Sequence, residues 1–278
     1  TSYAHYIWPL HRRWLGSFLS ARCKRCILSE KATTLTDDLC EHCQEHPRKA
    51  VSNADRSTLL EELSRLLEET SGGGTRKYDA IVLFSGGKDS VWLVHRLLKD
   101  YPKLRLLALT IDNTFMSPVA KSNIAYSISQ LNVDHVTYRP PSHIMDKMFR
   151  YAFLNLNDKG CSGTVDQFDG DFIMDCARSF AAEMNIPLVI AGLSPVQVEK
   201  IFNQYHYETS REKEAATRTH VAGLALADIF SAEELLYWWD GTKYQEDRRP
   251  RVIFPLYCWD YDEEAIKKQV TTLGLLPK

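Results

Sequence analysis

The sequence predicts an α/β protein with a doubly wound, mostly parallel sheet and a small metal-binding domain ahead of it. Three observations support this prediction. Short apolar runs rich in strand formers alternate with helical patterns from residue 80 to residue 273. The first of these runs ends in a glycine turn that leads directly into a helix. Two Cys-x-x-Cys pairs precede the alternating region.

The bulk composition is that of a soluble globular protein, with 278 residues, 44% hydrophobic and 25% charged. A net charge of −2 does not mark the chain as a binder of polyanions. No apolar stretch approaches membrane-spanning length, no secretory signal is visible, and the chain starts at Thr1 rather than at a methionine, as expected of a trimmed chain. Seven cysteines, four of them in two pairs, suit a reducing compartment, so we expect a cytoplasmic protein without membrane association.

The first 50 residues are predicted to hold an amphipathic helix over residues 1–22 and then a metal site. The expected ligands are the two cysteine pairs, which thirteen residues separate: Cys23, Cys26, Cys40 and Cys43. Each pair points two thiolates at one ion, and two pairs complete a tetrahedron, which predicts structural Zn²⁺ in a zinc-ribbon-like domain. An iron–sulfur cluster or a redox pair is the alternative, because thiolates also suit iron.

A connecting part is predicted next, with a capped helix over residues 53–70 and a flexible linker at Ser71-Gly-Gly-Gly74. We therefore expect three parts, namely residues 1–50, residues 51–77 and a main domain over residues 78–278.

The main domain is predicted to open with a strand at residues 80–84, the turn Ser85-Gly86-Gly87 and a helix with apolar residues from Val91 to Leu98. A glycine turn before a helix N-terminus makes an anion site, because the backbone can approach the ligand and the free N–H groups and helix dipole favour phosphate. Ser85, Ser90 and Lys88 add side-chain donors. An ordinary strand-to-helix turn is the alternative.

Two further strands are predicted at residues 104–111 and 134–138, with a helix over residues 119–131 between them. The first of these strands ends in Asp112 and Asn113, and ligands gather at the carboxyl ends of strands in an open parallel sheet. Both residues are therefore candidate nucleotide contacts, although a polar turn that caps the next helix explains Asn113 equally well. Two prolines end the second strand, and Ser142 begins another helix.

The pattern is predicted to break at Gly160-Cys161-Ser162-Gly163-Thr164. The acidic residues from Asp166 to Asp175 are interpreted as a solvated loop, with magnesium or amine binding as the alternative. Cys176 then begins a helix, and a strand at residues 187–191 ends in a second glycine turn at Gly192. Residues 196–222 leave room for a mobile lid. A helix over residues 231–239, a strand at 252–257 and a helix over 263–273 complete the chain.

The motif Ser85-Gly86-Gly87-Lys88-Asp89-Ser90 resembles the pyrophosphate loop of the PP-loop ATP pyrophosphatases. Those enzymes cleave ATP between the α and β phosphates and transfer AMP to a substrate oxygen. The cysteine pairs Cys-x-Arg-Cys-Ile-Leu and Leu-Cys-x-x-Cys, this loop, and Leu109-Thr-Ile-Asp-Asn-Thr-Phe115 with Asn123-Ile124 together resemble the N-acetyl sugar amidotransferase family of that group. The resemblance covers residues 23–200. That family has paired cysteines before the fourth strand, where this chain has Cys161 and, fifteen residues later, Cys176.

The resemblance implies a Rossmann-like domain that binds ATP with Mg²⁺. In this sequence the implied ATP contacts are Phe84, Ser85, Gly86, Gly87, Lys88, Asp89, Ser90, Asp112, Asn113 and Gly192. Lys88 would hold the departing pyrophosphate together with backbone amides of the turn, and Asp89 would place the Mg²⁺ ion. Lys88 and Asp89 are therefore predicted to be catalytic.

The implied activity is an AMP-forming transfer in which a carbonyl or amide oxygen of a small substrate is adenylated and then replaced by nitrogen. A separate glutaminase would deliver the ammonia, because neither Cys161 nor Cys176 has an evident Cys–His context. Sulfur transfer to a small molecule, or less favourably to a tRNA base, is the alternative.

In the sulfur alternative, Cys161 and Cys176 are catalytic thiols that carry and resolve a persulfide received from a sulfur-donor protein. Cys176 at a helix N-terminus would then have a lowered pKa, whereas burial as a small apolar residue is the competing interpretation for both cysteines. A second alternative is a non-catalytic nucleotide-binding module. A homodimer is possible, since the sequence does not define the oligomeric state.

Overall fold

The computed structural model describes residues 7, 8, 11, 14, 20–24, 29–30, 34–40, 43–44, 53–158, 160–202 and 204–277. The chain divides into two compact units, residues 1–52 and residues 53–278. Most of the helix predicted over residues 1–22, and Cys26, lie outside the described residues. In the described part of the chain, no helix is long and apolar enough to span a membrane.

The first unit contains a small hairpin, with β1 (Leu35–Thr36) paired antiparallel to β2 (Leu39–Cys40). The two residues between the strands, Asp37 and Asp38, have φ values of 51° and 63°. Positive φ at both central residues is the geometry of the two-residue hairpin turn that matches strand twist, and Asp tolerates it better than most residues. The hairpin thereby places Cys40 at the end of a strand.

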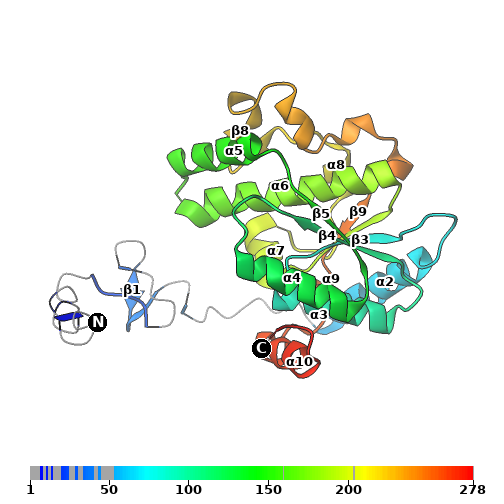
Figure 1. Ribbon diagram of the computed structural model, residues 1–278, viewed down its shortest axis with the longest axis horizontal. Helices are drawn as coiled ribbons and strands as arrows, with labels where there is room; N and C mark the ends of the chain where they lie inside the picture. The colour runs from blue at the N-terminus through cyan, green and yellow to red at the C-terminus, as the bar shows by residue number, and fades with distance from the viewer. Residues whose placement is uncertain are drawn as a thin grey trace. The chain divides into compact units, whose positions relative to one another are not determined.

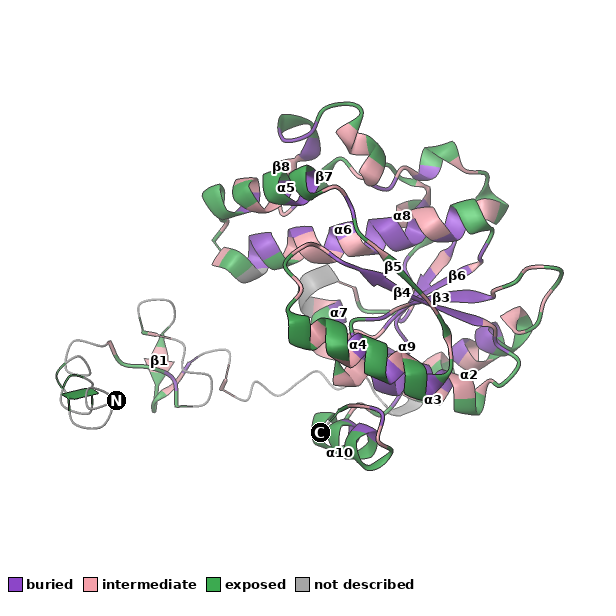
Figure 2. Cartoon of the chain, in the orientation of Figure 1, coloured by how far each residue is buried: buried purple, intermediate pink, exposed green. Residues whose placement is uncertain are grey.

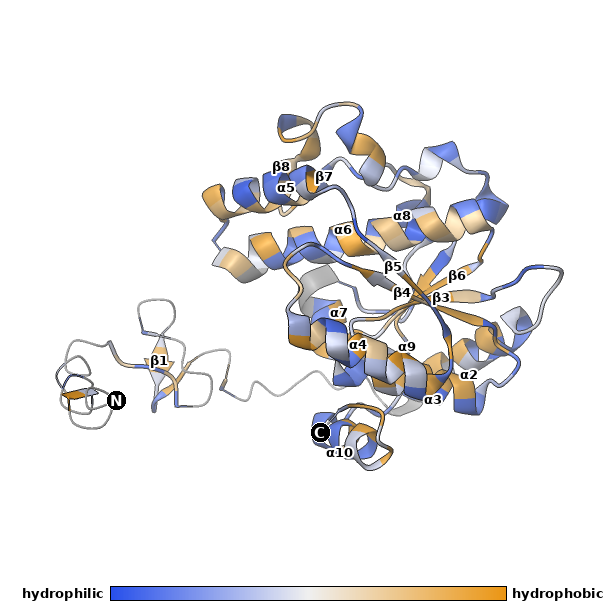
Figure 3. Ribbon diagram, in the orientation of Figure 1, coloured by the Kyte–Doolittle hydropathy of each residue, from blue (hydrophilic) through white to orange (hydrophobic). Residues whose placement is uncertain are grey.

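The second unit is built on a five-stranded sheet in the order β5-β4-β3-β6-β9, with every neighbouring pair parallel. The strands are β3 (Ala80–Leu83), β4 (Leu106–Ile111), β5 (Asp134–Tyr138), β6 (Leu188–Ala191) and β9 (Arg251–Ile253). The central strands are almost completely buried and apolar, as Figures 2 and 3 show. This arrangement confirms the predicted α/β class with a parallel sheet covered on both faces.

Helices cover both faces of this sheet (Figure 1). One face carries α3 (Lys88–Asp100) and α4 (Pro118–Leu131), and the other carries α6 (Gly160–Met184), on which α5 (Ser142–Leu154) packs. The chain steps outward from β3 to β5 and then returns to β6 on the other side of β3. Because crossovers between parallel strands are right-handed, reversing the direction moves the crossover helix to the opposite face. The strand order reverses between β3 and β6, which explains why α6 lies on the face opposite α3 and α4.

The remaining helices pack around this framework. Contacts join α2 (Asn53–Thr70) to α9 (Pro255–Cys258), and α10 (Glu263–Thr272) to α3. The indole N–H of Trp92 on α3 donates to the Gln269 side chain on α10 at 2.8 Å. Ser127 on α4 donates to the Leu275 carbonyl at 2.7 Å. Helix α10 is therefore fixed against α3, which begins at the glycine turn, and the residues after α10 contact α4.

Two element predictions are wrong in the region between residues 160 and 184. The predicted break and acidic loop are part of one 25-residue helix, α6, and Cys176 lies in its middle rather than at its start. Phe168 and Phe172 are fully buried and meet Trp238 edge-on at 6.2 and 5.1 Å. Burial of these aromatic side chains along one face offsets the poor helix propensity of the local glycine and aspartate residues.

Two predicted elements near the C-terminus are shorter than expected. The strand ends at Ile253, and Pro255 then begins α9, where a missing N–H is tolerated at the first helical position. The helix predicted over residues 231–239 is only a 3₁₀ turn, Glu234–Tyr237.

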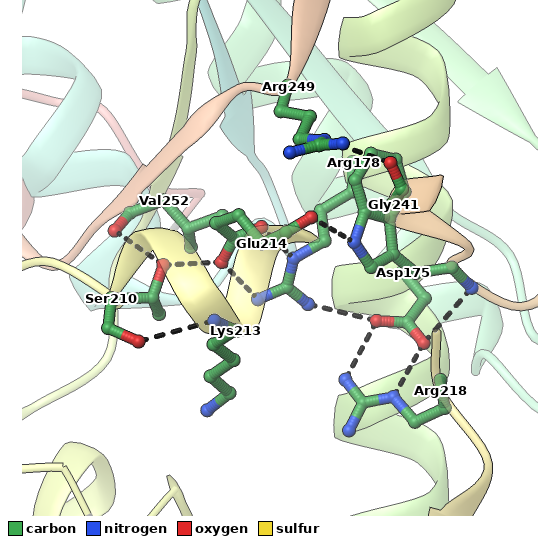
Figure 4. A network of polar contacts seen from close by, with 11 residues as sticks. Asp175, Arg178, Ser210, Lys213, Glu214, Arg218, Gly241, Arg249 and Val252 are labelled. Atoms are coloured by element: carbon green, nitrogen blue, oxygen red, sulfur yellow. Dashed lines mark hydrogen bonds and ion pairs between the residues drawn. The ribbon is translucent and has the colours of Figure 1, made fainter. Parts of the chain in front are cut away.

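Residues 204–250 fold back over α6 and contain α8 (Arg211–Ala215), the two-stranded pair β7 (His220–Val221) and β8 (Leu224–Ala225), and short 3₁₀ turns; α7 (Pro195–Phe202) precedes them. A mobile lid was expected at residues 196–222. Two residues of that segment are instead tied to α6, because Glu214 pairs with Arg178 at 2.7 Å and Arg218 pairs with Asp175 at 2.7 Å (Figure 4). These ion pairs attach the part of the segment around Glu214 and Arg218 to α6.

Candidate functional site at the carboxyl edge of the sheet

The glycine turn lies where the central strand β3 meets the first turn of α3, as predicted. Gly86 has a φ of 72°, and a Cβ atom there would lie 2.6 Å from Ile124 Cγ1 and 3.0 Å from the Ile124 backbone nitrogen. Only glycine accepts both this left-handed conformation and this close approach of α4. Ser85 and Gly87 are exposed, so the turn presents its backbone and a hydroxyl to solvent.

Hydrogen bonds within the turn fix its shape. The Ser90 hydroxyl donates to the Gly87 carbonyl at 3.0 Å, and the Gly87 N–H points to Ser85 Oγ at 3.4 Å. The first N–H groups of an α-helix have no carbonyl one turn earlier to bind. The start of α3, a helix of 13 residues, therefore offers amide donors and the positive end of a helix dipole to an anion.

Lys88 and Asp89 face each other beside the turn, with Lys88 Nζ 2.8 Å from an Asp89 carboxylate oxygen. Burial disfavours the charged form of Lys88, but the hydrogen bond and charge of Asp89 outweigh it, so the pKa of the Lys88 ammonium lies above its ordinary value. Lys88 therefore carries its positive charge throughout the physiological pH range. Two further side chains, Tyr261 and Glu263, reach this pair from the C-terminal segment.

The end of β4 lies next to the turn, because β4 pairs with β3 and the Phe84 N–H donates to the Leu109 carbonyl at 2.9 Å. Asp112, buried at this end, binds Arg139 at 2.5 Å and Lys121 at 3.1 Å. Burial alone would raise the pKa of the Asp112 carboxyl, but the two cations outweigh it and hold that pKa below its ordinary value. Asp112 thus gathers two positive side chains at this edge.

Asn113 connects the same edge to α6, since its side-chain amide donates to Asp169 at 3.0 Å. Burial raises the pKa of the Asp169 carboxyl, and the hydrogen bond from Asn113 opposes that shift. Asp171 and Asp175, further along α6, are buried rather than solvated. All of these acidic residues are helix positions, and Asp169, Asp171 and Asp175 have specific partners, so the interpretation as a solvated loop is wrong.

Gly192 directly follows β6 on the other side of β3, where the strand order reverses. A Cβ atom at Gly192 would lie 3.4 Å from both the nitrogen and Cα of Ser90. Gly192 therefore lies in close contact with the start of α3. In open α/β sheets, ligands bind in the crevice at this topological switch point.

Phe84 is placed differently from the other residues of the motif, because its ring is buried and lies edge-on to His135 at 6.3 Å. The Thr110 hydroxyl donates to the Phe84 carbonyl at 2.6 Å. The ring of Phe84 is therefore part of the core and is not available to a ligand.

The two cysteines predicted as catalytic have opposite environments. Cys176 is 4% exposed, and burial together with the nearby Asp175 raises the pKa of its thiol. The predicted lowered pKa at a helix start is wrong, because the thiol lies mid-helix in the protein core, away from the helix dipole's N-terminal end. Cys161 is exposed in the first turn of α6. Eight residues separate it from Asp169, which is about 12 Å along a helix.

Sequence reasoning missed four side chains of this edge. Arg139 directly follows β5, so the strand-end rule that identified Asp112 could also have found it. Lys121 lies in the first turns of α4 without a comparable signal. Tyr261 and Glu263 are 172 or more residues from Asp89 in sequence, and no local pattern links them to the turn.

A cleft of about 430 Å³ lies at the opposite edge of the sheet, beside the residue before β6 and the first residue of β9. Its lining is Pro187, Arg211, Glu246, Asp247, Arg249 and Arg251. Because ligands of open α/β sheets bind at the carboxyl ends of the strands, we place the functional site at the glycine turn and not at this cleft.

Three of the four predicted zinc ligands come together in the first unit. The Sγ atoms of Cys23, Cys40 and Cys43 lie within 4.8 Å of one another, and the Cys43 N–H donates to the Cys40 carbonyl at 2.8 Å. Thiolates bonded to one tetrahedral ion at about 2.3 Å lie roughly 3.8 Å apart, so this donor set fits a metal. Thiolates suit zinc and iron alike, and Cys26 falls outside the described residues.

Replacing Cys40 by Ser is expected to remove bound metal, because it deletes a fully buried ligand from the centre of the group. Metal content should fall from about one ion per chain to near zero, and the first unit should become sensitive to protease, since binding energy at structural sites is folding energy. Elemental analysis and limited proteolysis measure this. Cys161→Ser is the matched control and should keep its metal; retention of metal in Cys40→Ser would contradict the assignment.

Comparisons with known proteins concern the fold. The sequence matches none of the protein-family models, and a search of curated protein sequences also finds no match. Similar solved structures include the U34-tRNA thiolase NcsA from Methanococcus maripaludis with its [4Fe–4S] cluster, at 15% identity and a TM-score of 0.43, covering 94% of this chain and 75% of that chain.

Two further structures are similar. One is the NH₃-dependent NAD synthetase from Campylobacter jejuni with nitrate, at 18% identity and a TM-score of 0.38, covering 55% of this chain and 62% of that chain. The other is phosphoadenylyl-sulfate reductase from Candida auris in a phosphate complex, at 13% identity and a TM-score of 0.42, covering 81% of this chain and 88% of that chain. At these identities and scores, none of the three assigns an activity to this chain.

Proposed function

We propose that this chain is an ATP pyrophosphatase of the PP-loop type, which adenylates an oxygen of a small substrate and releases pyrophosphate. One observation carries the proposal. The Ser85–Ser90 motif stands at the carboxyl end of the central strand, where the strand order reverses, with Gly86 held in the left-handed conformation that brings backbone close to a ligand. A phosphate at this position could bind the amide donors at the start of α3, and the exposed Ser85 and Gly87 make the turn accessible from solvent.

The roles of the residues follow from their positions. The amides of the turn and the Lys88 ammonium would bind the β and γ phosphates and stabilise the charge on the departing pyrophosphate. Lys121 and Arg139, gathered by Asp112 at the adjacent strand end, would share the charge of the α-phosphate. Lys88, the cation at the turn, is the principal catalytic residue of this proposal.

Asp89 is the residue that would hold Mg²⁺, which when bound neutralises phosphate charge. The donor set fits this ion, because Mg²⁺ in such sites relies on one or two carboxylates together with phosphate oxygens. The Asp89 carboxylate is oriented by Lys88 on one oxygen and by the Tyr261 hydroxyl on the other. These two contacts fix the orientation of the carboxylate beside Lys88.

The reaction proposed has two balanced halves. A carboxylate, amide or ketone oxygen of the substrate forms a bond to the α-phosphorus while the bond to the β-phosphate oxygen breaks, and pyrophosphate leaves. Ammonia then bonds to the activated carbon, the C–O bond breaks, AMP departs with the original oxygen, and the nitrogen releases a proton to solvent. The substrate is thus a small carbonyl compound, and the ammonia would come from a partner glutaminase.

Nitrogen transfer is favoured over sulfur transfer by the environments of the cysteines. Cys176 and Cys258 are buried, and Cys161 is the exposed thiol among these three. A persulfide carrier that needs a resolving thiol would require a second accessible cysteine, which Cys176 does not provide. Sulfur transfer through Cys161 alone remains the second candidate because that side chain is exposed.

Nucleotide binding at the turn is tested with α,β-methylene-ATP, in which the bond proposed to break is replaced. Calorimetric titration in the presence of Mg²⁺ should show binding that pyrophosphate displaces, because both ligands would occupy the same amides. Absence of binding, or binding that pyrophosphate leaves unchanged, would contradict the proposal.

The transferred atom is tested by Cys161→Ser. If nitrogen is transferred from ammonia, AMP formation with ammonium ion and a small-molecule extract as the source of substrate should stay within about twofold of wild type, as for an exposed residue away from the reacting atoms. A loss of AMP formation in Cys161→Ser, together with a sulfur adduct on Cys161 detected by mass spectrometry in the wild-type chain, would establish the sulfur route instead.

A further inference from the structure

The C-terminal segment reaches the glycine turn with two side chains that the proposed function does not require for phosphate binding. Glu263, in the first turn of α10, places a carboxylate oxygen 3.3 Å from Lys88 Nζ. The Tyr261 hydroxyl donates to Asp89 at 3.1 Å. Lys88 therefore faces two carboxylates, those of Asp89 and Glu263, before any phosphate is bound.

The segment that carries Glu263 is anchored on α3, although the Glu263 side chain itself is exposed. Trp259 lies edge-on to Trp92 at 5.8 Å, and the Arg96 guanidinium stacks over the Trp259 ring at 4.1 Å. Asp262 caps α10 by accepting the Ala265 N–H at 3.0 Å. The helix that presents the turn at its start thus also positions Glu263 above it.

The charges around Lys88 decide what happens when a polyphosphate arrives. The Lys88 side chain is 25% exposed, whereas the Glu263 side chain is 64% exposed. Asp89 is bound to Lys88 at 2.8 Å and further held by Tyr261, so it is the better-ordered of the two carboxylates. Glu263 is the exposed partner on a flexible stem, and it can swing into water at small cost.

We propose that Glu263 is an internal competitor of pyrophosphate: its carboxylate pairs with Lys88 in the nucleotide-free chain, is displaced by the β and γ phosphates of ATP, and pairs with Lys88 again as pyrophosphate leaves. This inference rests on the proposed function and adds a device for product release to it. A carboxylate that replaces pyrophosphate on Lys88 weakens binding of both ATP and product, because each must break the Lys88–Glu263 pair.

The test compares Glu263→Gln with Glu264→Gln. Both residues are exposed, both lie in the first turn of α10, and each substitution removes one negative charge near the helix N-terminus. Of these two glutamates, only Glu263 forms an ion pair with Lys88 among the described contacts. The titrant is pyrophosphate with Mg²⁺, followed by calorimetry at low salt.

Glu263→Gln should bind pyrophosphate about two- to fivefold more tightly than wild type, the size expected for loss of a partly exposed ion pair, while Glu264→Gln stays near wild type. The difference should shrink at high salt, because exposed pairs are screened. Equal affinities of the two variants, with pyrophosphate binding intact in wild type, would overturn this inference and leave the proposed function standing. No pyrophosphate binding in wild type would overturn both.

Discussion

Lys88→Ala is expected to reduce pyrophosphate release from ATP about 10²- to 10³-fold, the cost of removing one preorganised group that stabilises charge in a transition state. The loss should fall on turnover and on pyrophosphate affinity together, because Lys88 is the cation at the turn itself. Folding should be affected little, since Lys88 is a partly exposed partner of Asp89 and Glu263. A coupled pyrophosphate assay with a small-molecule extract, and a thermal melt, measure the two effects.

Lys99→Ala is the matched control for this substitution, because Lys99 is an exposed lysine in the last turn of the same helix. It should keep both turnover and melting temperature. If Lys88→Ala retained more than about a tenth of wild-type turnover, the role of a preorganised charge-stabilising group would be contradicted.

Arg178→Met is expected to lower the free energy of unfolding by about 3–5 kcal/mol, because it leaves buried carboxylates without their central cation. Arg178 is 2% exposed and lies between Asp175 at 2.9 Å and Glu214 at 2.7 Å (Figure 4). Arg218 still pairs with Asp175 and Thr209 still donates to Glu214, but neither replaces the bridge between α6 and α8. Urea unfolding measures the change.

Arg150→Met provides the matched control, since Arg150 is exposed on α5 and the side-chain change is the same. It should change the free energy of unfolding by no more than about 0.5 kcal/mol, the usual range for exposed positions. Equal losses in the two variants would mean that the buried ion pairs do not hold residues 204–250 onto α6. The interpretation of residues 196–222 as a mobile lid would then be supported.

The sequence predicted those parts of the site whose pattern lies within one continuous stretch of residues. A strand, a glycine turn and a helix follow one another at residues 80–100, and the structure confirms the strand and the helix on either side of the turn. Asp112 and Gly192 were found because polar and glycine residues after buried strands share one edge of a parallel sheet. The structure brings both to the ends of the strands that flank β3.

The failures have a common physical cause in tertiary packing. The glycines at 160 and 163 and the aspartates that follow are poor helix formers, yet burial of Phe168 and Phe172 against Trp238 keeps α6 continuous. The same burial makes Cys176 a core residue with a raised pKa rather than a reactive thiolate.

Sequence patterns could not predict the contacts of the C-terminal segment either. The Lys88–Glu263 pair depends on how α10 docks on α3, and nothing in either helix alone encodes that docking. Long-range side-chain pairs of this kind have no periodic signal, whereas strands and helices do.

The most direct measurement of the central claim is the identity of the products formed from ATP. ³¹P NMR of the chain turning over Mg²⁺–ATP with a small-molecule extract should show AMP and pyrophosphate appearing in equal amounts, because the α–β bond is the one placed to break at the turn. Formation of ADP and phosphate as the enzyme's own products, abolished by Lys88→Ala, would contradict the account.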